Sequence, residues 1–244
     1  MRKIRPVFLY CSIRRLFDNL WIVFCLLGFH LSAQTDSLVP ASGGDKIWFS
    51  TIPNTKQESL EPYYKALKNA EYGVQRFSVI DQLAAFHIDQ ANTDSILYYG
   101  NLYKKEIALW DAPENAKKIH FSKAYYMLGV GNRFNGLLDN SIKWHINGIT
   151  SGEEGNSSKG VYRNKIGLAK IYILKEEENK AISVLEEGLS AFEDELPLIT
   201  NDALICLGDA FFNLKEYDEA KSLYEKAFEG AKNLGTLPKN WKSI

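Results

Sequence analysis

The sequence predicts an all-α fold in which helical hairpins repeat in tandem and stack into a solenoid. Two observations support this: sets of small residues recur at a period of about forty residues, and helical apolar spacing surrounds them. The three sets are Gly129, Ala169 and Gly208, then Ser141, Ala181 and Ala220, then Gly148, Gly188 and Ala227. Repetition at such a period is typical of stacked units rather than of one closed core.

The last unit, residues 202–227, has the clearest pattern of two amphipathic helices separated by a break near residues 214–217. Its apolar positions are Leu204, Leu207 and Phe211, followed by Ala220, Leu223, Tyr224 and Ala227. Gly208 lies inside the first of these helices, where Gly costs roughly 1 kcal/mol relative to Ala. Close approach of another helix explains why this position stays small in three units.

These markers resemble the tetratricopeptide repeat, whose pattern is a large residue, Leu-Gly, an aromatic residue, Ala, a second aromatic residue and Ala. The matching positions are Leu204, Leu207, Gly208, Phe211, Tyr217, Ala220, Tyr224 and Ala227, then Leu168, Ala169, Tyr172, Ala181, Leu185 and Gly188, then Tyr125, Leu128, Gly129, Ser141, His145 and Gly148. The resemblance covers residues 122–234 and implies a right-handed superhelix of the kind found in exported bacterial proteins. Because the family unit is 34 residues, we expect extra residues at the links 153–159 and 194–198.

A more degraded unit precedes these three. Residues 80–88 and 95–102 are expected to be its two helices, residues 110–114 an inserted loop, and residues 59–75 a leading helix. The whole array, about four hairpins plus the leading helix, is therefore placed at 59–236. Residues 237–244 are expected to be a tail or the start of a truncated next repeat, because the period puts another unit there.

The N-terminal residues 1–33 have the order of a secretory signal peptide. Basic residues precede the apolar run 20–31, and Ser32 and Ala33 then offer small residues for cleavage. The run is shorter than the 20 or so residues that a membrane span needs. Residues 34–58, rich in Pro and Gly, are expected to be a flexible linker. We therefore expect export to the periplasm or the extracellular space, with a general or a twin-arginine route both left open.

Composition excludes several function classes. The chain has 29 Lys and Arg against 30 Asp and Glu, so no basic stripe predicts nucleic-acid binding. Only Cys206 lies outside the predicted leader, which leaves no internal disulfide. His145 is expected in the core, and His87 and His120 at the surface or its boundary. No cofactor motif, metal-ligand pattern or catalytic constellation is present, so we expect neither enzyme activity, nor a cofactor, nor a bound metal.

The resemblance implies a groove lined by the first helix of each hairpin. The candidate partner-binding residues are Lys123, Tyr126, Arg133, Arg163, Ile166, Lys170, Ile205 and Asp209. The middle of this surface is basic and apolar, which favours an acidic or C-terminal peptide with an apolar anchor. Packing between units is the alternative role for some of these residues. The family's carboxylate clamp is not expected, because one of its positions is filled by Tyr126, Ile166 and Ile205.

Two classes of function remain open from the sequence. The first is a non-catalytic scaffold or adaptor that binds a protein or peptide in the groove outside the cytoplasm. The second is the sensing part of a bacterial signalling protein, either a sensor histidine kinase or a regulator, whose membrane helix and output domain lie elsewhere. A membrane would then be reached only through a partner or a further segment. A nutrient-binding lipoprotein fits less well, because no Cys suits lipidation.

Overall fold

The computed structural model describes residues 60–192 and 197–235. Within these two ranges the regular structure is entirely helical, as the sequence predicts. The helices are α2 (Glu61–Asn69), α3 (Val74–Asp89), α4 (Thr93–Leu109), α5 (Glu114–Phe134), α6 (Leu138–Glu154), α7 (Ser158–Leu174), α8 (Glu178–Phe192), α9 (Pro197–Asn213) and α10 (Tyr217–Asn233). The expected signal peptide (1–33), linker (34–58) and tail (237–244) lie outside the described residues.

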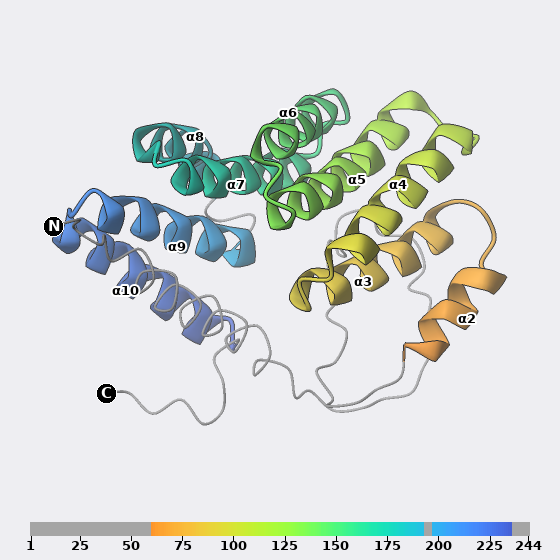
Figure 1. Ribbon diagram of the computed structural model, residues 1–244, viewed down its shortest axis with the longest axis horizontal. Coiled ribbons are helices and arrows are strands. Elements are labelled where there is room, and N and C mark those ends of the chain that lie inside the picture. The colour runs from red at the N-terminus through yellow and green to blue at the C-terminus, as the bar shows by residue number, and fades with distance from the viewer. Residues whose placement is uncertain (1–59, 193–196, 236–244) are drawn as a thin grey trace, which may run out of the picture.

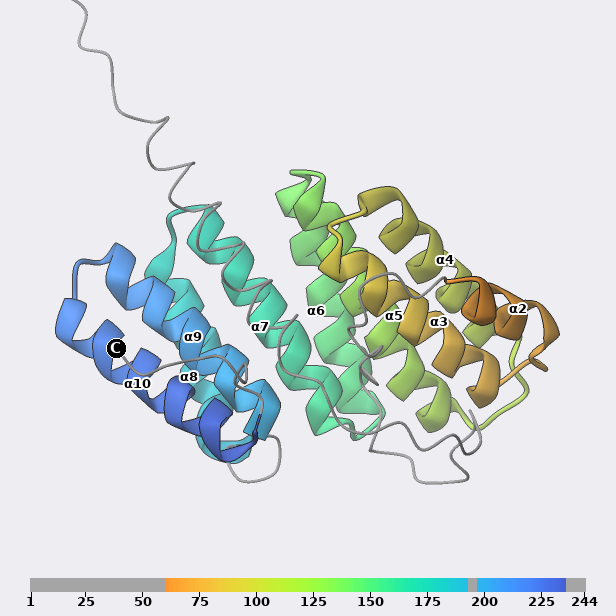
Figure 2. The same ribbon diagram turned by 90° about the horizontal axis from the view of Figure 1, so that it is seen from below.

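The helices stack as consecutive hairpins, and the first helices of successive hairpins form one layer. α5 contacts both α3 and α7, and α7 also contacts α9. The second helices α4, α6, α8 and α10 pack on first helices, and within the described ranges they share no comparable contact with one another. Figure 1 shows the result as an arch in which α3, α5 and α7 lie nearer the open side than α4, α6 and α8, while α10 lies below α9 at one end, and Figure 2 shows the same array from below with α10 in front of α9. The first helices therefore line the concave surface.

Tight left-handed turns connect most of these helices. Asn156, Glu176 and Lys215 have φ angles of 53°, 59° and 68°. After α6, the amide of Ser157 donates to Gly152 O (2.8 Å) and that of Asn156 donates to Glu153 O (3.1 Å). This pair of bonds is the Schellman motif, which satisfies carbonyl groups at a helix end. The same pair recurs after α3, α5, α7 and α9, so the links share one geometry.

The expectation of long links is wrong at 153–159. α6 continues to Glu154 and α7 begins at Ser158, so only three residues separate the two helices. The period exceeds the family's because the helices themselves are long: α6 and α7 have 17 residues each. At the second expected link, residues 194–196 lie outside the described ranges, and Pro197 and Leu198 already belong to α9.

The expected leading helix over 59–75 is also wrong in its extent. α2 ends at Asn69, and α3 begins at Val74. Gly73 separates them with a φ of +116°, a region that favours Gly. A Cβ there would lie 3.2 Å from the indole Nε1 of Trp110, so Gly73 also admits this ring at the α2–α3 turn. The expected loop at 110–114 is confirmed for residues 110–113, with Pro113 at the N-cap of α5, but Glu114 already belongs to that helix.

The small residues have the packing role that the period predicts. A Cβ on Gly129 would lie 2.5 Å from the His145 ring, and one on Gly208 would lie 2.5 Å from the Tyr224 ring. Each glycine therefore lets the second helix bring a ring against the backbone of the first. Ala169, Ala181 and Ala220 are likewise buried, with at most 1% exposure.

Candidate partner-binding surface

The candidate residues all come from first helices, but the structure distributes them over three places. Tyr126 and Arg133 on α5 lie with Arg163 and Lys170 on α7 along the middle of the concave layer. Lys123 lies on α5, beside α3. Ile205 and Asp209 lie on α9. We call Arg133, Arg163 and Lys170 the basic cluster.

Two members of the basic cluster lie over aromatic rings of α5. The Arg163 guanidinium lies 6.0 Å from the ring centroid of Tyr126, and that of Arg133 lies 4.5 Å from the ring of Phe134. Such contacts hold a guanidinium over the face of an aromatic ring. Arg133, Arg163, Lys170 and Tyr126 are all half-buried. Two adjacent helices thus bring three cations and a phenol into one area.

His145 from α6 lies beneath this area and is wholly buried. Its ring contacts Tyr126 edge-on, with the centroids 5.8 Å apart. Burial lowers the pKa of His145 to about 4, and the positive charges of Arg133 and Lys170 lower it further, against the hydrogen bond to Asn164, which raises it. The imidazole is therefore neutral at ordinary pH, and the positive charge of this area comes from the basic cluster alone.

A buried hydrogen-bond network fixes this ring in place. Asn164 donates through Nδ2 to the backbone oxygens of Ser122 (3.1 Å) and Gly160 (2.9 Å), which leaves Oδ1 facing His145 Nδ1 at 3.0 Å. Because an amide oxygen only accepts, His145 carries its proton on Nδ1. Ser122 Oγ donates to Gly148 O at 2.8 Å. The network joins α5, α6 and α7, so the interface that carries the basic cluster is tightly held.

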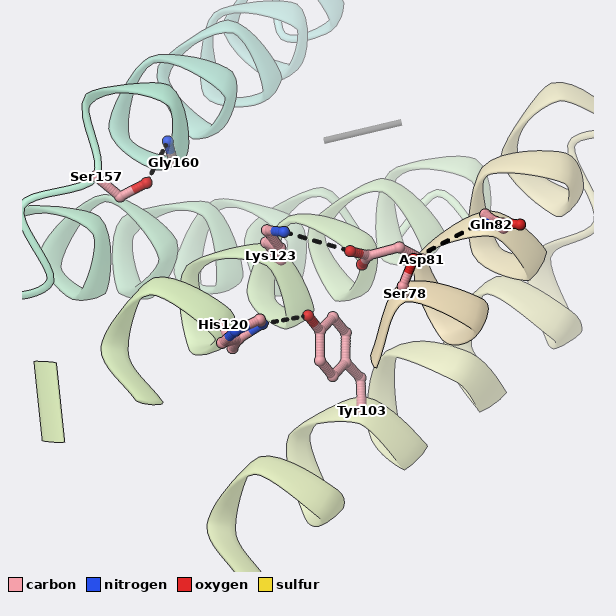
Figure 3. A network of polar contacts seen from close by, with 8 residues as sticks. All are labelled: Ser78, Asp81, Gln82, Tyr103, His120, Lys123, Ser157 and Gly160. Atoms are coloured by element: carbon pink, nitrogen blue, oxygen red, sulfur yellow. Dashed lines mark hydrogen bonds and ion pairs between the residues drawn. The ribbon is translucent and has the colours of Figure 1, made fainter. Parts of the chain in front are cut away.

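Lys123 belongs to a different environment at the α3–α5 interface. Its Nζ lies 3.4 Å from Asp81 Oδ2, and the Lys123 side chain is only 11% exposed. Figure 3 shows this ion pair close to the hydrogen bond between Tyr103 and His120, whose Oη and Nδ1 are 2.6 Å apart. Burial raises the pKa of Asp81 to about 6, although Lys123 lowers it. Lys123 therefore mainly joins α3 to α5 rather than facing a partner.

The remaining candidates also differ in exposure. Ile166 is 5% exposed and belongs to the core cluster of α7, α8 and α9, so its side chain packs between units instead of lining the groove. Ile205 is half-buried. Asp209 is exposed and accepts a hydrogen bond from Tyr224 Oη at 2.8 Å. The α9 end of the concave layer is thus less basic than the α5–α7 interface.

Several residues at these interfaces were not predicted from the sequence. Asn164 occupies the repeat position that Ala124 and Ala203 hold in the neighbouring hairpins. A polar residue at a position that is otherwise apolar was the signal that the sequence offered. The sequence contains no indication that Asp81 and Glu106 form buried ion pairs, because their cationic partners lie 42 and 30 positions away. The expected surface position of His87 is wrong, since it is 7% exposed. His120 does lie at the boundary, where burial lowers its pKa to about 3.

The described residues offer little sign of a metal site, a reactive cysteine or a membrane-spanning helix. They contain no group of three or more His, Cys, Asp or Glu side chains placed to hold a metal ion. Cys206 is buried, and burial raises the pKa of its thiol to about 12, which keeps it protonated and unreactive. A search of the same residues for a helix long and apolar enough to cross a membrane finds none.

Comparison with known proteins identifies one repeat directly. Residues 202–232, within α9 and α10, match the family model of the tetratricopeptide repeat. Among solved structures, the chain is similar to the nearly identical TPR-like repeats described for a kinesin light chain of Podosopora anserina, with 12% sequence identity and a TM-score of 0.47. That match covers 72% of this chain and 86% of the other. No curated protein sequence matches the chain.

The matched repeat and the earlier hairpins share one construction. Gly208 and Gly129 each receive a ring from the second helix of their own hairpin, and the same Schellman turn ends α5, α7 and α9. Tetratricopeptide repeats generally mediate protein–protein interaction, and the fold is typically non-catalytic. Residues 202–232 thus match the tetratricopeptide repeat, and the hairpins stacked before them share its construction.

Proposed function

We propose that the protein is a non-catalytic scaffold that binds an acidic segment of a partner protein on its concave surface. The observation that supports this most directly is the basic cluster on α5 and α7: Arg163 lies over the Tyr126 ring, and Arg133 and Lys170 are close enough to His145, which contacts that ring, to lower its pKa. Arg side chains recognise carboxylates through paired hydrogen bonds, and Tyr offers an apolar face beside them.

The partner segment would combine carboxylates with an apolar anchor. The carboxylates lie against Arg133, Arg163 and Lys170, and the apolar side chain lies on Tyr126 or, toward α9, on half-buried Ile205. The hydrogen-bonded floor of His145 and Asn164 holds α5 and α7 together before the partner arrives. A preorganised surface loses less conformational entropy on binding, which favours affinity.

The test uses short synthetic peptides in which Glu residues flank a single Leu, with Gln counterparts as the uncharged series. Binding is measured by fluorescence anisotropy to the wild type and to the double variant Arg133→Glu, Lys170→Glu. We expect the Glu peptides to bind the wild type, and the double variant to bind them at least about tenfold more weakly, since each lost charge contact is worth about 1 kcal/mol or more. High salt should weaken wild-type binding.

The matched control reverses two charges on second helices. Lys105 on α4 and Lys226 on α10 are exposed, so Lys105→Glu with Lys226→Glu changes the net charge equally and leaves the residues of the concave layer unchanged. This variant should bind the Glu peptides as the wild type does. If both double variants bind equally well, or if the Gln series binds as tightly as the Glu series, the acidic-segment proposal is wrong.

We also propose that the scaffold acts outside the cytoplasm, on the strength of the signal-peptide pattern in residues 1–33. The test expresses the full chain in bacterial cells and determines the N-terminus of the product by mass spectrometry, together with its compartment. The expected product begins at Gln34 and is recovered with the periplasm or the medium. An intact N-terminus in the cytoplasm would refute this part.

A further inference from the structure

The charge of the inner layer reverses sign between α7 and α9. Both helices are 17 residues long, and the repeat places them in the same register. Arg163 is the sixth residue of α7 and Asp202 the sixth of α9, while Lys170 and Asp209 are the thirteenth residues of the same helices. Each of these α7 cations therefore has a carboxylate at its repeat position on the next first helix. We call Asp202 and Asp209 the acidic pair.

The acidic pair lies on one side of α9 with an apolar residue between its members. Ile205 follows Asp202 by three positions and precedes Asp209 by four, which places the three side chains on one side of the helix. Asp202 and Ile205 are half-buried, and Asp209 is exposed. Tyr224 Oη on α10 donates to Asp209 Oδ1 at 2.8 Å, which orients this carboxylate. This side of α9 thus offers a small apolar surface between two acids.

The two signs of charge lie close together where α7 contacts α9. Cys206 of α9 is 1% exposed and senses both of them. Burial raises the pKa of its thiol, the positive charges of Lys170 and Arg133 lower it, and the negative charges of Asp209 and Asp202 raise it further. The basic cluster therefore borders the acidic pair on the inner layer.

The spacing of packed helices sets the distance between the two charged areas. Neighbouring helices lie about 8–10 Å apart, and an extended chain covers about 3.3 Å per residue. A segment that crosses from α7 to α9 therefore passes from the basic cluster to the acidic pair within about three residues. A segment that is acidic throughout brings its own carboxylates against Asp202 and Asp209, where like charges repel.

We propose, building on the function proposed above, that the partner segment has mixed charge. Its carboxylates face the basic cluster, and a Lys or Arg about three residues away faces the acidic pair. An apolar side chain between the two lies on Ile205. The α7–α9 surface thus selects its partner by the order of charges, because a uniformly acidic segment is attracted by one helix and repelled by the next.

Fluorescence anisotropy with three peptides of equal length tests this charge order. Each peptide has a central Leu: the first has Glu on its N-terminal side and Lys on its C-terminal side, the second has the reverse order, and the third has Glu on both sides. The wild type should bind one of the two mixed peptides at least about tenfold more tightly than the all-Glu peptide.

Two double variants of the acidic pair should change this preference. Asp202→Asn with Asp209→Asn removes both charges and keeps an oxygen that can accept from Tyr224. This variant should bind the mixed and all-Glu peptides within about threefold of each other. Asp202→Lys with Asp209→Lys should reverse the preference and bind the all-Glu peptide more tightly. Thermal melting of each variant shows whether the array is still folded.

The matched control removes two acids that lie on second helices. Glu153 on α6 and Glu186 on α8 are exposed. Glu153→Gln with Glu186→Gln changes the net charge as much as the Asn variant does and leaves the residues of the concave layer unchanged. This variant should keep the wild-type preference for a mixed peptide.

The possible failures separate this proposal from the function on which it rests. If the all-Glu peptide binds the wild type as tightly as both mixed peptides, and Arg133→Glu with Lys170→Glu weakens it, the mixed-charge proposal is wrong and acidic-segment binding stands. If none of the three peptides binds, both proposals fail. Asn or Lys variants that lower the Tm but keep the wild-type preference also overturn the mixed-charge proposal, because the acidic pair then serves only to hold α9 against α7.

Discussion

The two ends of the arch stack helices in the same way but fill their interfaces differently. Around α7 to α10 the core is apolar and built on small residues, with Ala169, Ala181 and Leu207 among its members. Around α3 to α5, a group of contacting aromatic rings joins the aliphatic side chains of the core, with Phe77 at 5.1 Å from the Tyr103 ring and 5.3 Å from Trp110. Ion pairs cross the same region, including Arg76 with Glu106.

The difference shows that one architecture tolerates two packing solutions. Small markers allow close helix approach, and the spacing of such markers is visible in a sequence. Large rings and paired charges can hold helices equally well, but they follow no fixed pattern, because their partners come from distant positions. The α3–α5 region therefore lost its repeat signature without losing its place in the stack. Its stability should depend on polar pairs, which can be tested.

The largest expected effect comes from breaking the buried ion pair at the α3–α4 interface. Glu106 is 2% exposed, and both of its carboxylate oxygens lie 2.8 Å from Arg76 Nε. Glu106→Ala leaves the arginine without its counter-charge, which typically costs about 3–5 kcal/mol. Urea denaturation measures the loss. The double variant Arg76→Met, Glu106→Met should recover part of it, because no charge then stays buried. A double variant less stable than Glu106→Ala would contradict this explanation.

The matching test at the other end removes apolar volume. Leu185 is 0% exposed within the core of α7 to α9. Leu185→Ala should lower the free energy of unfolding by about 3 kcal/mol, because the cavity it leaves cannot fully close. Leu189, only partly buried beside the same cluster, is the control, and Leu189→Ala should cost less. Equal losses at both positions would mean that burial does not set the stability of this end.

The sequence predicted the parts of the fold that depend on local pattern. The hairpins from α5 to α10 follow from the small markers, because Gly129 and Gly208 lie inside helices, and a glycine kept at such a position indicates that a neighbouring side chain approaches closely. The break at Gly73 was missed because the helical apolar spacing continues across it, from Leu67 to Phe77. At the candidate partner-binding surface, the sequence placed Tyr126 and Arg163 on first helices, where the structure has them. The burial of Ile166 and the pairing of Lys123 with Asp81 depend on tertiary contacts that no single segment specifies.

A third prediction concerns pH at the junction between the two ends. The pKa of His145 is about 4 in the folded protein, below its ordinary value of 6.5. The unfolded chain therefore binds the proton more readily, and the histidine lowers the stability as pH falls from about 6.5 to 4. One pKa unit is worth 1.36 kcal/mol, so the effect at pH 4 is on the order of 2–3 kcal/mol.

The substitution His145→Leu tests this, because Leu185 occupies the same register in the next unit. Its stability should change less than that of the wild type between pH 6.5 and 4, as followed by urea denaturation at several pH values. His120, whose pKa is also lowered by burial, should maintain part of the slope in both proteins. Parallel pH profiles for the two proteins would show that the pKa of His145 is not lowered in the folded protein.

The smallest effect is expected from an exposed ion pair at the apolar end. Lys165 Nζ on α7 lies 2.9 Å from Glu187 Oε2 on α8, whose side chain is 75% exposed. Water and salt screen such a pair, so Lys165→Met, which keeps the packed stem, should cost about 0.5 kcal/mol or less, and high salt should abolish the difference. A salt-resistant loss comparable to that of Glu106→Ala would mean that charge pairs stabilise both ends. The contrast between a polar and an apolar end of the arch would then fail.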